Sequence, residues 1–351
     1  MAEENQTTHK RRVRYSGKYP KKFEEKYKEL QPEKYKDTIE HVIKKGNTPA
    51  GMHISIMVNE ILDFLKIQPG ETGFDATLGY GGHTKAMLQC LKGQGHIYAT
   101  DVDPEESART RKRLEEAGFG EDILTIRLQN FCTIDEIAKE AGGFDFILAD
   151  LGVSSMQIDN PKRGFSFKVD GPLDLRLNQE AGISAADRLP AITKDELAGM
   201  LYENSDEPYC EELAKAITDE IRKGNRIDTT TKLRNIIEKT LDFLPEKEKK
   251  DTIKKTCQRT FQALRIDVNR EFEVLYEFME KLPDALKPGG RAAILTFHSG
   301  EDKLVKKALK EGYRAGIYAD YAKDVIRPSA QECAQNGRAR STKMRWAIKA
   351  E

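Results

Sequence analysis

Residues 74–88, FDATLGYGGHTKAML, decide the fold of this chain. An apolar run typical of a strand breaks into Gly79-Tyr80-Gly81-Gly82 and then continues with helical spacing. A strand, a glycine-rich turn and a helix in this order bring bare backbone close to a nucleotide-like cofactor in open α/β sheets. The stretch therefore predicts a cofactor-binding α/β domain and leaves open which cofactor binds there.

Strand and helix patterns alternate on both sides of this turn. We predict strands at 72–78, 96–101, 123–128 and 144–150, with helices at 82–92, 104–117 and 133–141. Before these elements, residues 54–67 carry apolar residues at helical spacing, and this helical pattern stops at Pro69-Gly70. Such alternation with short connections predicts a parallel sheet that is covered by helices on both faces.

The pattern changes after residue 151. Residues 152–170 are rich in loop formers, and residues from about 184 to 257 show helical spacing without strands. A long amphipathic helix over 260–282, a strand in KPGGRAAILTF, a helix in EDKLVKKALKEG and a last strand in TKMRWAIKA follow. We therefore divide the chain into a basic N-terminal extension (1–50), a first α/β part (51–160), an inserted helical domain (161–258) and a second α/β part (259–351).

The 351 residues carry no net charge, but the charge is unevenly distributed. Residues 1–50 carry +5 and residues 303–351 carry +7, which leaves −12 for the rest. Basic ends on an acidic body suggest a polyanionic partner, and solvated surface is the alternative. The five cysteines show no metal-binding or disulfide spacing, and no stretch has the length of a signal peptide core or a membrane span. We expect a soluble, cytoplasmic protein.

The glycine turn favours S-adenosylmethionine as the cofactor. The third glycine of the dinucleotide fingerprint would fall at Thr84, which disfavours NAD, and no P-loop lysine follows. S-adenosylmethionine has no pyrophosphate, while its ribose diol needs a carboxylate acceptor and its amino-acid tail needs close backbone approach. Asp101, about 20 residues past the turn, is placed to bind a ribose. The alternative is that Asp101 caps the next helix, for which Asp103 is better placed.

Asp150 ends the fourth predicted strand, where ligands bind in open α/β sheets. It is followed by Gly-Val-Ser-Ser, whereas amine methyltransferases usually have Asp or Asn followed by Pro-Pro and an aromatic residue at this place. These residue types alone do not identify the methyl acceptor.

Five stretches together resemble the bacterial 16S ribosomal RNA cytosine-N4 methyltransferase family, known as RsmH or MraW. They are FDATLGYGGHT, ADLGVSSMQIDNPKRGFSFKVDGPLDLRL, RTFQALRIDVNREF, ILTFHSGEDKLVKKAL and NGRARSTKMR, and they span nearly everything from His53 onward. The resemblance implies a class I, Rossmann-like methyltransferase fold with an inserted all-helical domain. It also implies S-adenosylmethionine as the methyl donor and a cytosine in the decoding region of the small ribosomal subunit as the acceptor.

The resemblance also implies the cofactor contacts. They are Gly81, Gly82, His83, Asp101, Phe131, Asp150 and Gln157. The chain departs from the family pattern in having Gly300 where leucine is usual and Asp267 where alanine is usual. It also has a leader of about fifty residues before the usual start. These departures are compatible with a paralogous branch.

Candidate catalytic and RNA-binding residues follow from chemistry. Asp150 is the candidate acceptor for an amine hydrogen, and His298 after the fifth strand would open onto the same edge of the sheet. We expect Phe165 and Phe167 to be exposed aromatics that stack on a base beside Arg163, with packing of a loop flap as the alternative. Further RNA contacts are expected at Arg265, Asn269, Arg338, Arg340, Lys343 and Arg345. The alternatives are helix anchoring for the first two and a solvated strand edge for the rest.

Two other functions remain open at this point. A non-catalytic RNA-binding or ribosome-assembly protein could keep the same fold, and a methyltransferase could act on a different RNA. An NAD-dependent oxidoreductase is disfavoured by the missing glycine. The sequence leaves open the modified nucleotide and whether the protein is a monomer or a homodimer. We expect deletion of residues 1–45 to lower RNA affinity in a salt-dependent way.

Overall fold

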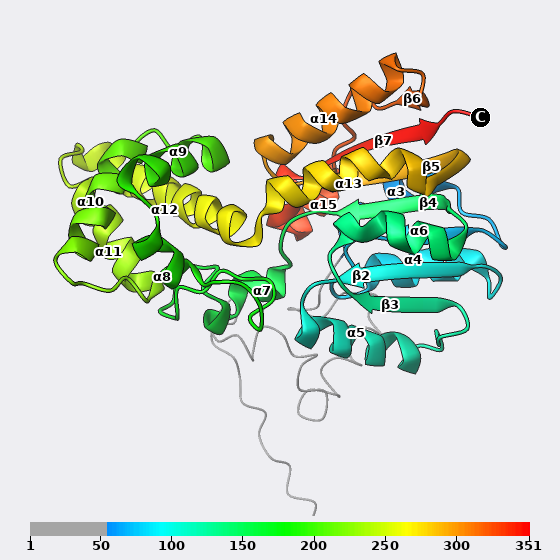
Figure 1. Ribbon diagram of the computed structural model, residues 1–351, viewed down its shortest axis with the longest axis horizontal. Coiled ribbons are helices and arrows are strands. Elements are labelled where there is room, and N and C mark those ends of the chain that lie inside the picture. The colour runs from blue at the N-terminus through cyan, green and yellow to red at the C-terminus, as the bar shows by residue number, and fades with distance from the viewer. Residues whose placement is uncertain (1–54) are drawn as a thin grey trace, which may run out of the picture. The chain divides into compact units, whose positions relative to one another are not determined.

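The computed structural model of this chain describes residues 55–351, which belong to one compact unit. The basic extension predicted for residues 1–50 lies outside the described residues. The described part contains a seven-stranded sheet in the order β3-β2-β1-β4-β5-β7-β6 (Figure 1). The strands are β1 (Thr72–Asp75), β2 (His96–Asp101), β3 (Leu124–Leu128), β4 (Phe144–Asp150), β5 (Leu286–Thr296), β6 (Tyr318–Tyr321) and β7 (Lys343–Lys349).

The first five strands are parallel, and β7 is antiparallel to both β5 and β6. This order with its antiparallel β7 is that of class I methyltransferases, so the fold expected from the sequence is confirmed. All six predicted strands are present, although β1 ends at Asp75 rather than at residue 78. Strand β6 was not predicted because it has only four residues and two of them are exposed.

Helices cover both faces of the sheet, as the alternating pattern predicts. One face packs against α3 (Val58–Leu65), α4 (Gly82–Leu91) and α5 (Pro104–Glu116). The other packs against α6 (Ile134–Ala141), α13 (Glu271–Ala285) and α14 (Ser299–Arg314) (Figure 1). The strands are buried on both sides, because Phe74 and Ile147 contribute to one core while Phe146 and Leu148 contribute to the other.

Between β4 and α13 the chain is helical. The helices are α7 (Ser155–Asp159), α8 (Ala185–Arg188), α9 (Lys194–Ser205), α10 (Cys210–Arg222), α11 (Thr230–Thr240) and α12 (Glu246–Asn269). A separate hydrophobic core drawn from residues 165–264 holds this part together, and it lies beside the sheet in Figure 1. We retain the division at 161–258 as a proposal. Its second boundary falls inside the continuous helix α12.

The single long helix predicted over 260–282 is wrong in one respect. Two helices meet there, because Arg270 adopts a left-handed conformation with φ 52° and ends α12. A left-handed residue at the end of a helix is usually glycine or asparagine, so the arginine at position 270 did not indicate that the helix ends there.

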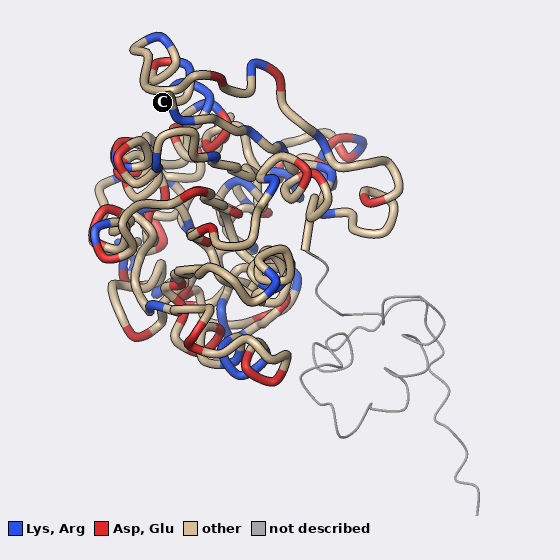
Figure 2. The backbone as a smooth tube through the Cα atoms, turned by 90° about the vertical axis from the view of Figure 1, so that its right-hand side faces the viewer, with Lys and Arg blue, Asp and Glu red and all other residues tan. Residues whose placement is uncertain are grey.

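Basic and acidic residues are interspersed along the described chain (Figure 2). Part of the basic surplus in residues 303–351 faces acids, because Lys343 and Arg345 both bind Asp302. Within residues 55–351, no helix combines the length and apolar character needed to cross a membrane.

Candidate active site

A cleft of about 360 Å³ opens at the carboxyl ends of β1 and β4. The strand order reverses between these two strands, and ligands of open α/β sheets bind at such a switch point. One half of the cleft is lined by the glycine turn and the ends of β2 and β4. The other half is lined by the end of α12, the start of α14 and residues 336–341. The cleft therefore lies between the sheet and the end of the helical part.

The glycine turn brings backbone to the floor of this cleft. Gly81 has φ 80° and precedes α4, which begins without a side-chain cap. A Cβ atom at Gly81 would lie 2.6 Å from Thr110, and one at Gly82 would lie 2.0 Å from the Ser55 hydroxyl. A side chain at either position would therefore require Thr110 or Ser55 to move, and the first N–H groups of α4 have no acceptor within the helix.

Asp101 ends β2 and lines the cleft beside the turn. Its carboxylate accepts hydrogen bonds from the N–H groups of Gly79 and Asp103, both at 2.8 Å. Burial raises the pKa of Asp101 to about 7. The capping alternative for Asp101 is wrong, because Asp103 accepts from the N–H groups of Glu105 and Glu106 at the start of α5.

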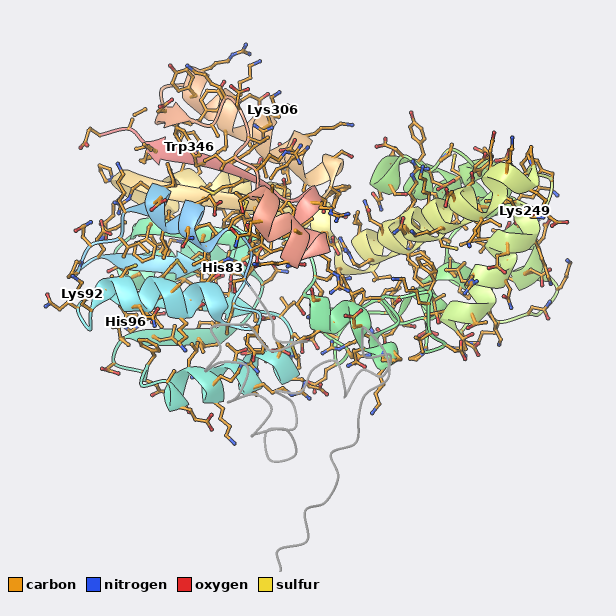
Figure 3. All side chains as sticks on the ribbon, turned by 180° about the vertical axis from the view of Figure 1, so that it is seen from behind. His83, Lys92, His96, Lys249, Lys306 and Trp346 are labelled. Carbon is orange, nitrogen blue, oxygen red and sulfur yellow. The ribbon has the colours of Figure 1, made fainter. Side chains whose placement is uncertain are left out.

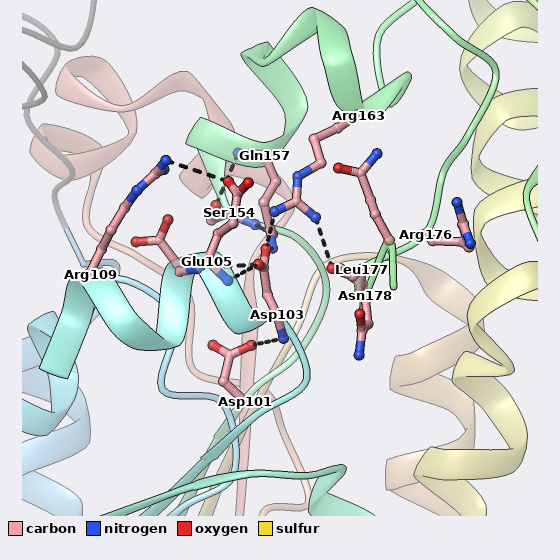
Figure 4. Close-up of polar contacts among 12 residues, drawn as sticks. Asp101, Asp103, Glu105, Arg109, Ser154, Gln157, Arg163, Arg176, Leu177 and Asn178 are labelled. Atoms are coloured by element: carbon pink, nitrogen blue, oxygen red, sulfur yellow. Dashed lines mark hydrogen bonds and ion pairs between the residues drawn. The ribbon is translucent and has the colours of Figure 1, made fainter. Parts of the chain in front are cut away.

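Asp103 also connects the half of the cleft that is lined by the glycine turn, here called the cofactor half, to the loop before the helical part. Its Oδ2 accepts from the Arg163 guanidinium at 2.6 Å and from the Gln157 amide at 3.0 Å (Figure 4). The second arm of Arg163 donates to the carbonyl of Leu177 at 2.9 Å. Arg163 was predicted to contact RNA, but its guanidinium is buried and bound to protein groups.

Asp150 ends β4 in the centre of the cleft. Its N–H donates to the Thr77 hydroxyl at 2.7 Å, and its Oδ2 lies 3.5 Å from Nδ1 of His83. Its Oδ1 is buried and has no hydrogen-bond partner among the described residues. Burial raises the pKa of Asp150 to about 6, although the nearby His83 lowers it. The carboxylate therefore keeps one oxygen without a protein partner, and the Asp150 side chain as a whole lines the cleft.

Phe131 and Gln157 line the cleft with the other predicted cofactor contacts. The Phe131 ring packs edge-on against Phe278, with 5.2 Å between the ring centroids. Gln157 forms a capping box with Ser154 at the start of α7, which fixes its position. All seven predicted cofactor residues thus lie around one cleft.

The opposite half of the cleft holds a compact charged cluster. Arg265 donates two hydrogen bonds to Glu271, at 2.8 and 2.9 Å. His298 Nε2 lies 3.1 Å from the Glu301 carboxylate, which also accepts from the Phe297 N–H at 2.8 Å. Ligand atoms of Glu271, His298 and Glu301 lie within 4.8 Å of one another. Because Arg265 already supplies a cation to this cluster, we assign no metal to it.

Asn269 anchors the loop that enters the helical part. Its Oδ1 accepts from the Leu177 N–H at 2.8 Å, and its Nδ2 donates to the Leu175 carbonyl at 2.7 Å. This geometry supports the helix-anchoring alternative for Asn269, although the residue also lines the cleft.

The expectation that Phe165 is exposed is wrong. Phe165 is buried, and Phe167 is partly buried with its ring 5.7 Å from that of Phe261. Both belong to the hydrophobic core of the helical part. The loop between α7 and α8 folds onto that core, so its aromatic side chains are drawn inward.

The four basic residues near the C-terminus differ in their surroundings. Arg345 is buried and binds Asp302, which also accepts from Lys343. Arg338 lines the cleft and donates to Asp159 at 3.0 Å, while Arg340 is exposed. The structure therefore brings Arg338 to the cleft and places Arg345 in the interior.

A family model described as the MraW methylase family matches residues 50–350. The chain belongs to that family. This methylase is 86% identical to ribosomal RNA small subunit methyltransferase H 1 of Agathobacter rectalis over the full length of both chains. It is 70% identical to the protein of the same name from Lachnoclostridium phytofermentans, covering 99% of this chain and 95% of that one. Ribosomal RNA small subunit methyltransferase H of Koribacter versatilis is 36% identical, with 85% of this chain and 94% of that one covered.

The two departures of this methylase from the family pattern both have structural partners. A Cβ at Gly300 would lie 2.6 Å from the Phe272 ring, so a larger side chain there requires Phe272 to move. Asp267 accepts a hydrogen bond from Arg188 at 2.8 Å, which ties α12 to α8.

Sequence reasoning missed several residues of the cleft in this methylase. Gln262, Glu271 and Glu301 line it but carried no spacing signal of their own. Glu271 lies in the stretch RTFQALRIDVNREF, six residues after Arg265, and only the break at Arg270 brings the two side chains together. Ser55 and Ile56 also line the cleft, although their sequence predicted only the start of a helix.

Proposed function

We propose that this protein transfers the methyl group of S-adenosylmethionine to the exocyclic N4 amine of a cytosine in the RNA of the small ribosomal subunit, in the decoding region. The Asp150 side chain carries the proposal, because it ends β4 in the lining of the cleft and its carboxylate has an oxygen without a hydrogen-bond partner among the described residues. Membership of a methylase family supports the reaction type, and the names of the relatives support the RNA.

The cofactor half fits S-adenosylmethionine. The bare backbone at Gly81 and Gly82 suits the amino-acid tail, and the Asp101 carboxylate suits the ribose hydroxyls. Phe131 offers an apolar surface in the same half. When bound there, this cofactor supplies an electrophilic methyl group on a sulfonium.

The acceptor amine needs help from the protein, because its lone pair is conjugated with the cytosine ring. Positioning supplies most of the acceleration for such a reaction, and an acceptor for the amine hydrogen supplies the rest. The Asp150 carboxylate, whose side chain lines the cleft, is the acceptor that we propose for this hydrogen. His298 and Arg265 lie in the half of the cleft where the base would enter, so we propose that they orient it.

Methyl transfer into assembly-intermediate small subunits tests the proposal. We expect tritium from labelled S-adenosylmethionine to enter small-subunit RNA, and mass spectrometry of digested RNA to identify N4-methylcytidine. RNA binding without label would favour the non-catalytic assembly protein. Label in another nucleoside or another RNA would favour a methyltransferase with a different target.

Replacing Asp101 by alanine is expected to weaken cofactor binding by about 1–3 kcal/mol, because ribose hydroxyls would lose a buried acceptor. The wild-type affinity should fall as the pH drops below about 7, since protonation removes the carboxylate charge. The variant should lose this pH dependence. Isothermal titration at pH 6 and pH 8 measures both effects. The exposed Glu115 on α5, changed to alanine, is the control, and unchanged affinity in Asp101→Ala would reject the ribose assignment.

Arg340→Ala is expected to weaken RNA binding without changing cofactor affinity, because Arg340 is exposed beside the residues that line the cleft. Loss of one phosphate contact lowers the slope of log affinity against log salt by about 1. Filter binding at several salt concentrations measures the slope. Lys139→Ala removes another exposed cation, on α6, and should leave the slope unchanged. Equal slopes for Arg340→Ala and wild type would contradict the contact.

A further inference from the structure

The His83 side chain lies between Asp150 and the segment that precedes α3. Its Nε2 lies 2.8 Å from the carbonyl oxygen of Ile56, and its Nδ1 lies 3.5 Å from Asp150 Oδ2. The imidazole is 8% exposed, and each of its nitrogens faces a protein group. Figure 3 labels His83 at the end of α4 nearest the helical part. Any contact of His83 with the cofactor is therefore left mainly to its backbone N–H at the start of α4.

The contact with Ile56 fixes the tautomer of this histidine. A carbonyl oxygen only accepts hydrogen bonds, so Nε2 must carry the proton. In the neutral ring Nδ1 is then unprotonated. The neighbouring Met57 N–H donates to Glu332 at 2.8 Å, which holds the segment that presents the Ile56 carbonyl.

His83 Nδ1 and Asp150 Oδ2 can therefore share a single proton between them. With His83 neutral and Asp150 ionised, both atoms are acceptors, which accounts for a separation longer than a hydrogen bond. A proton placed on either atom would be shared with the other. The remaining charged groups near Asp150 are Asp75 on β1 and Glu301 on α14, and neither donates to it.

We propose that His83 is a positioning residue that orients Asp150 and shares the proton that Asp150 takes from the acceptor amine. The inference rests on the function proposed above. A nitrogen–carbon bond forms there as the bond between the methyl carbon and sulfur breaks, so the amine must lose one proton. That proton passes to Oδ2 of Asp150, from which a hydrogen bond to His83 Nδ1 then stabilises it until it leaves to solvent.

Nuclear magnetic resonance tests the geometry independently of activity. Long-range proton–nitrogen spectra of the full-length protein with nitrogen-15 histidine, recorded at pH 8, should show His83 with a protonated Nε2 and a bare Nδ1. Comparison with His83→Gln assigns the signal. Asp150→Asn should shift the Nδ1 resonance, because the asparagine amide can donate to it. A protonated Nδ1 in the neutral ring, or an Nδ1 signal indifferent to Asp150→Asn, would overturn the proposal.

Kinetics of His83→Gln tests the role. A glutamine amide can still donate to the Ile56 carbonyl but cannot share a proton at the Nδ1 position. We expect kcat to fall about 10-fold to 100-fold while the cofactor Kd stays within about threefold, because a misplaced reacting group costs up to about 10²-fold in rate. His96→Gln is the matched control, since His96 starts β2 at the opposite end of the strand from Asp101 (Figure 3).

The outcomes separate this inference from the function on which it rests. A weaker cofactor Kd with unchanged kcat, or no change in either, would overturn the role of His83 in a wild-type enzyme that is active. Absence of methyl transfer by the wild type would refute the proposed function instead. If His83→Gln does not fold, sequential backbone assignment identifies the His83 signal, and the spectra of the wild type and of Asp150→Asn decide the matter.

Discussion

Asp150→Asn is expected to lower the rate of methyl transfer by about 10²- to 10⁴-fold, the usual contribution of a positioned proton acceptor. An asparagine oxygen can still orient an amine but cannot take its proton. Single-turnover transfer from labelled S-adenosylmethionine into small-subunit RNA measures the rate. Asp324→Asn, an exposed carboxylate, should have no effect.

The loss of rate in Asp150→Asn should occur without loss of stability. The folded protein holds the Asp150 proton more tightly than the unfolded chain, because burial raises the pKa to about 6. Stability contributed by this group therefore declines as the pH rises from about 4 to 6. A neutral asparagine avoids that decline, so unfolding in urea at pH 8 should show a variant at least as stable as wild type. Transfer within threefold of wild type would show that another group accepts the hydrogen.

Arg163→Met is expected to destabilise the protein by about 3–5 kcal/mol, the usual cost of leaving a buried partner charge unpaired. The charge left behind is that of Asp103, whose side chain is 1% exposed. Arg163→Lys should restore only part of the loss, because one ammonium does not reproduce the forked contact with both Asp103 and Leu177. Urea unfolding followed by circular dichroism measures the change.

A double-mutant cycle isolates the ion pair. Asn can still cap α5 in Asp103→Asn, so this change removes the charge and keeps the cap. The double variant Arg163→Met with Asp103→Asn should lose less stability than the sum of the single variants. If Arg163 instead served RNA directly, Arg163→Met would keep its stability and lose RNA affinity with a smaller salt slope.

The strands and helices of the α/β part, and their order along the chain, could be predicted because the spacing of apolar residues depends on which faces of an element are buried. Strands such as β4 are buried on both faces and appear as continuous apolar runs, and helices such as α6 repeat apolar residues every third or fourth position. The placement of Asp101 and Asp150 also followed from sequence, because the end of a parallel strand lies at a known edge of the sheet.

The partners of charged residues were not predictable in the same way. Arg163 and Arg345 look like their exposed neighbours in sequence, yet each binds an acid 60 or 43 positions away, Asp103 and Asp302 respectively. Choosing such a partner requires the tertiary fold. The proton-sharing pair of His83 and Asp150 is hidden for the same reason, since 67 residues separate two side chains that meet only at the switch point.

Helix α12 sets a length scale for the substrate. Its 24 residues extend about 36 Å at 1.5 Å per residue, from the lysine-rich start to the residues that line the cleft. A ligand that touches both ends must therefore span about 36 Å. A ligand confined to the cleft therefore leaves the lysine-rich start of α12 uncovered.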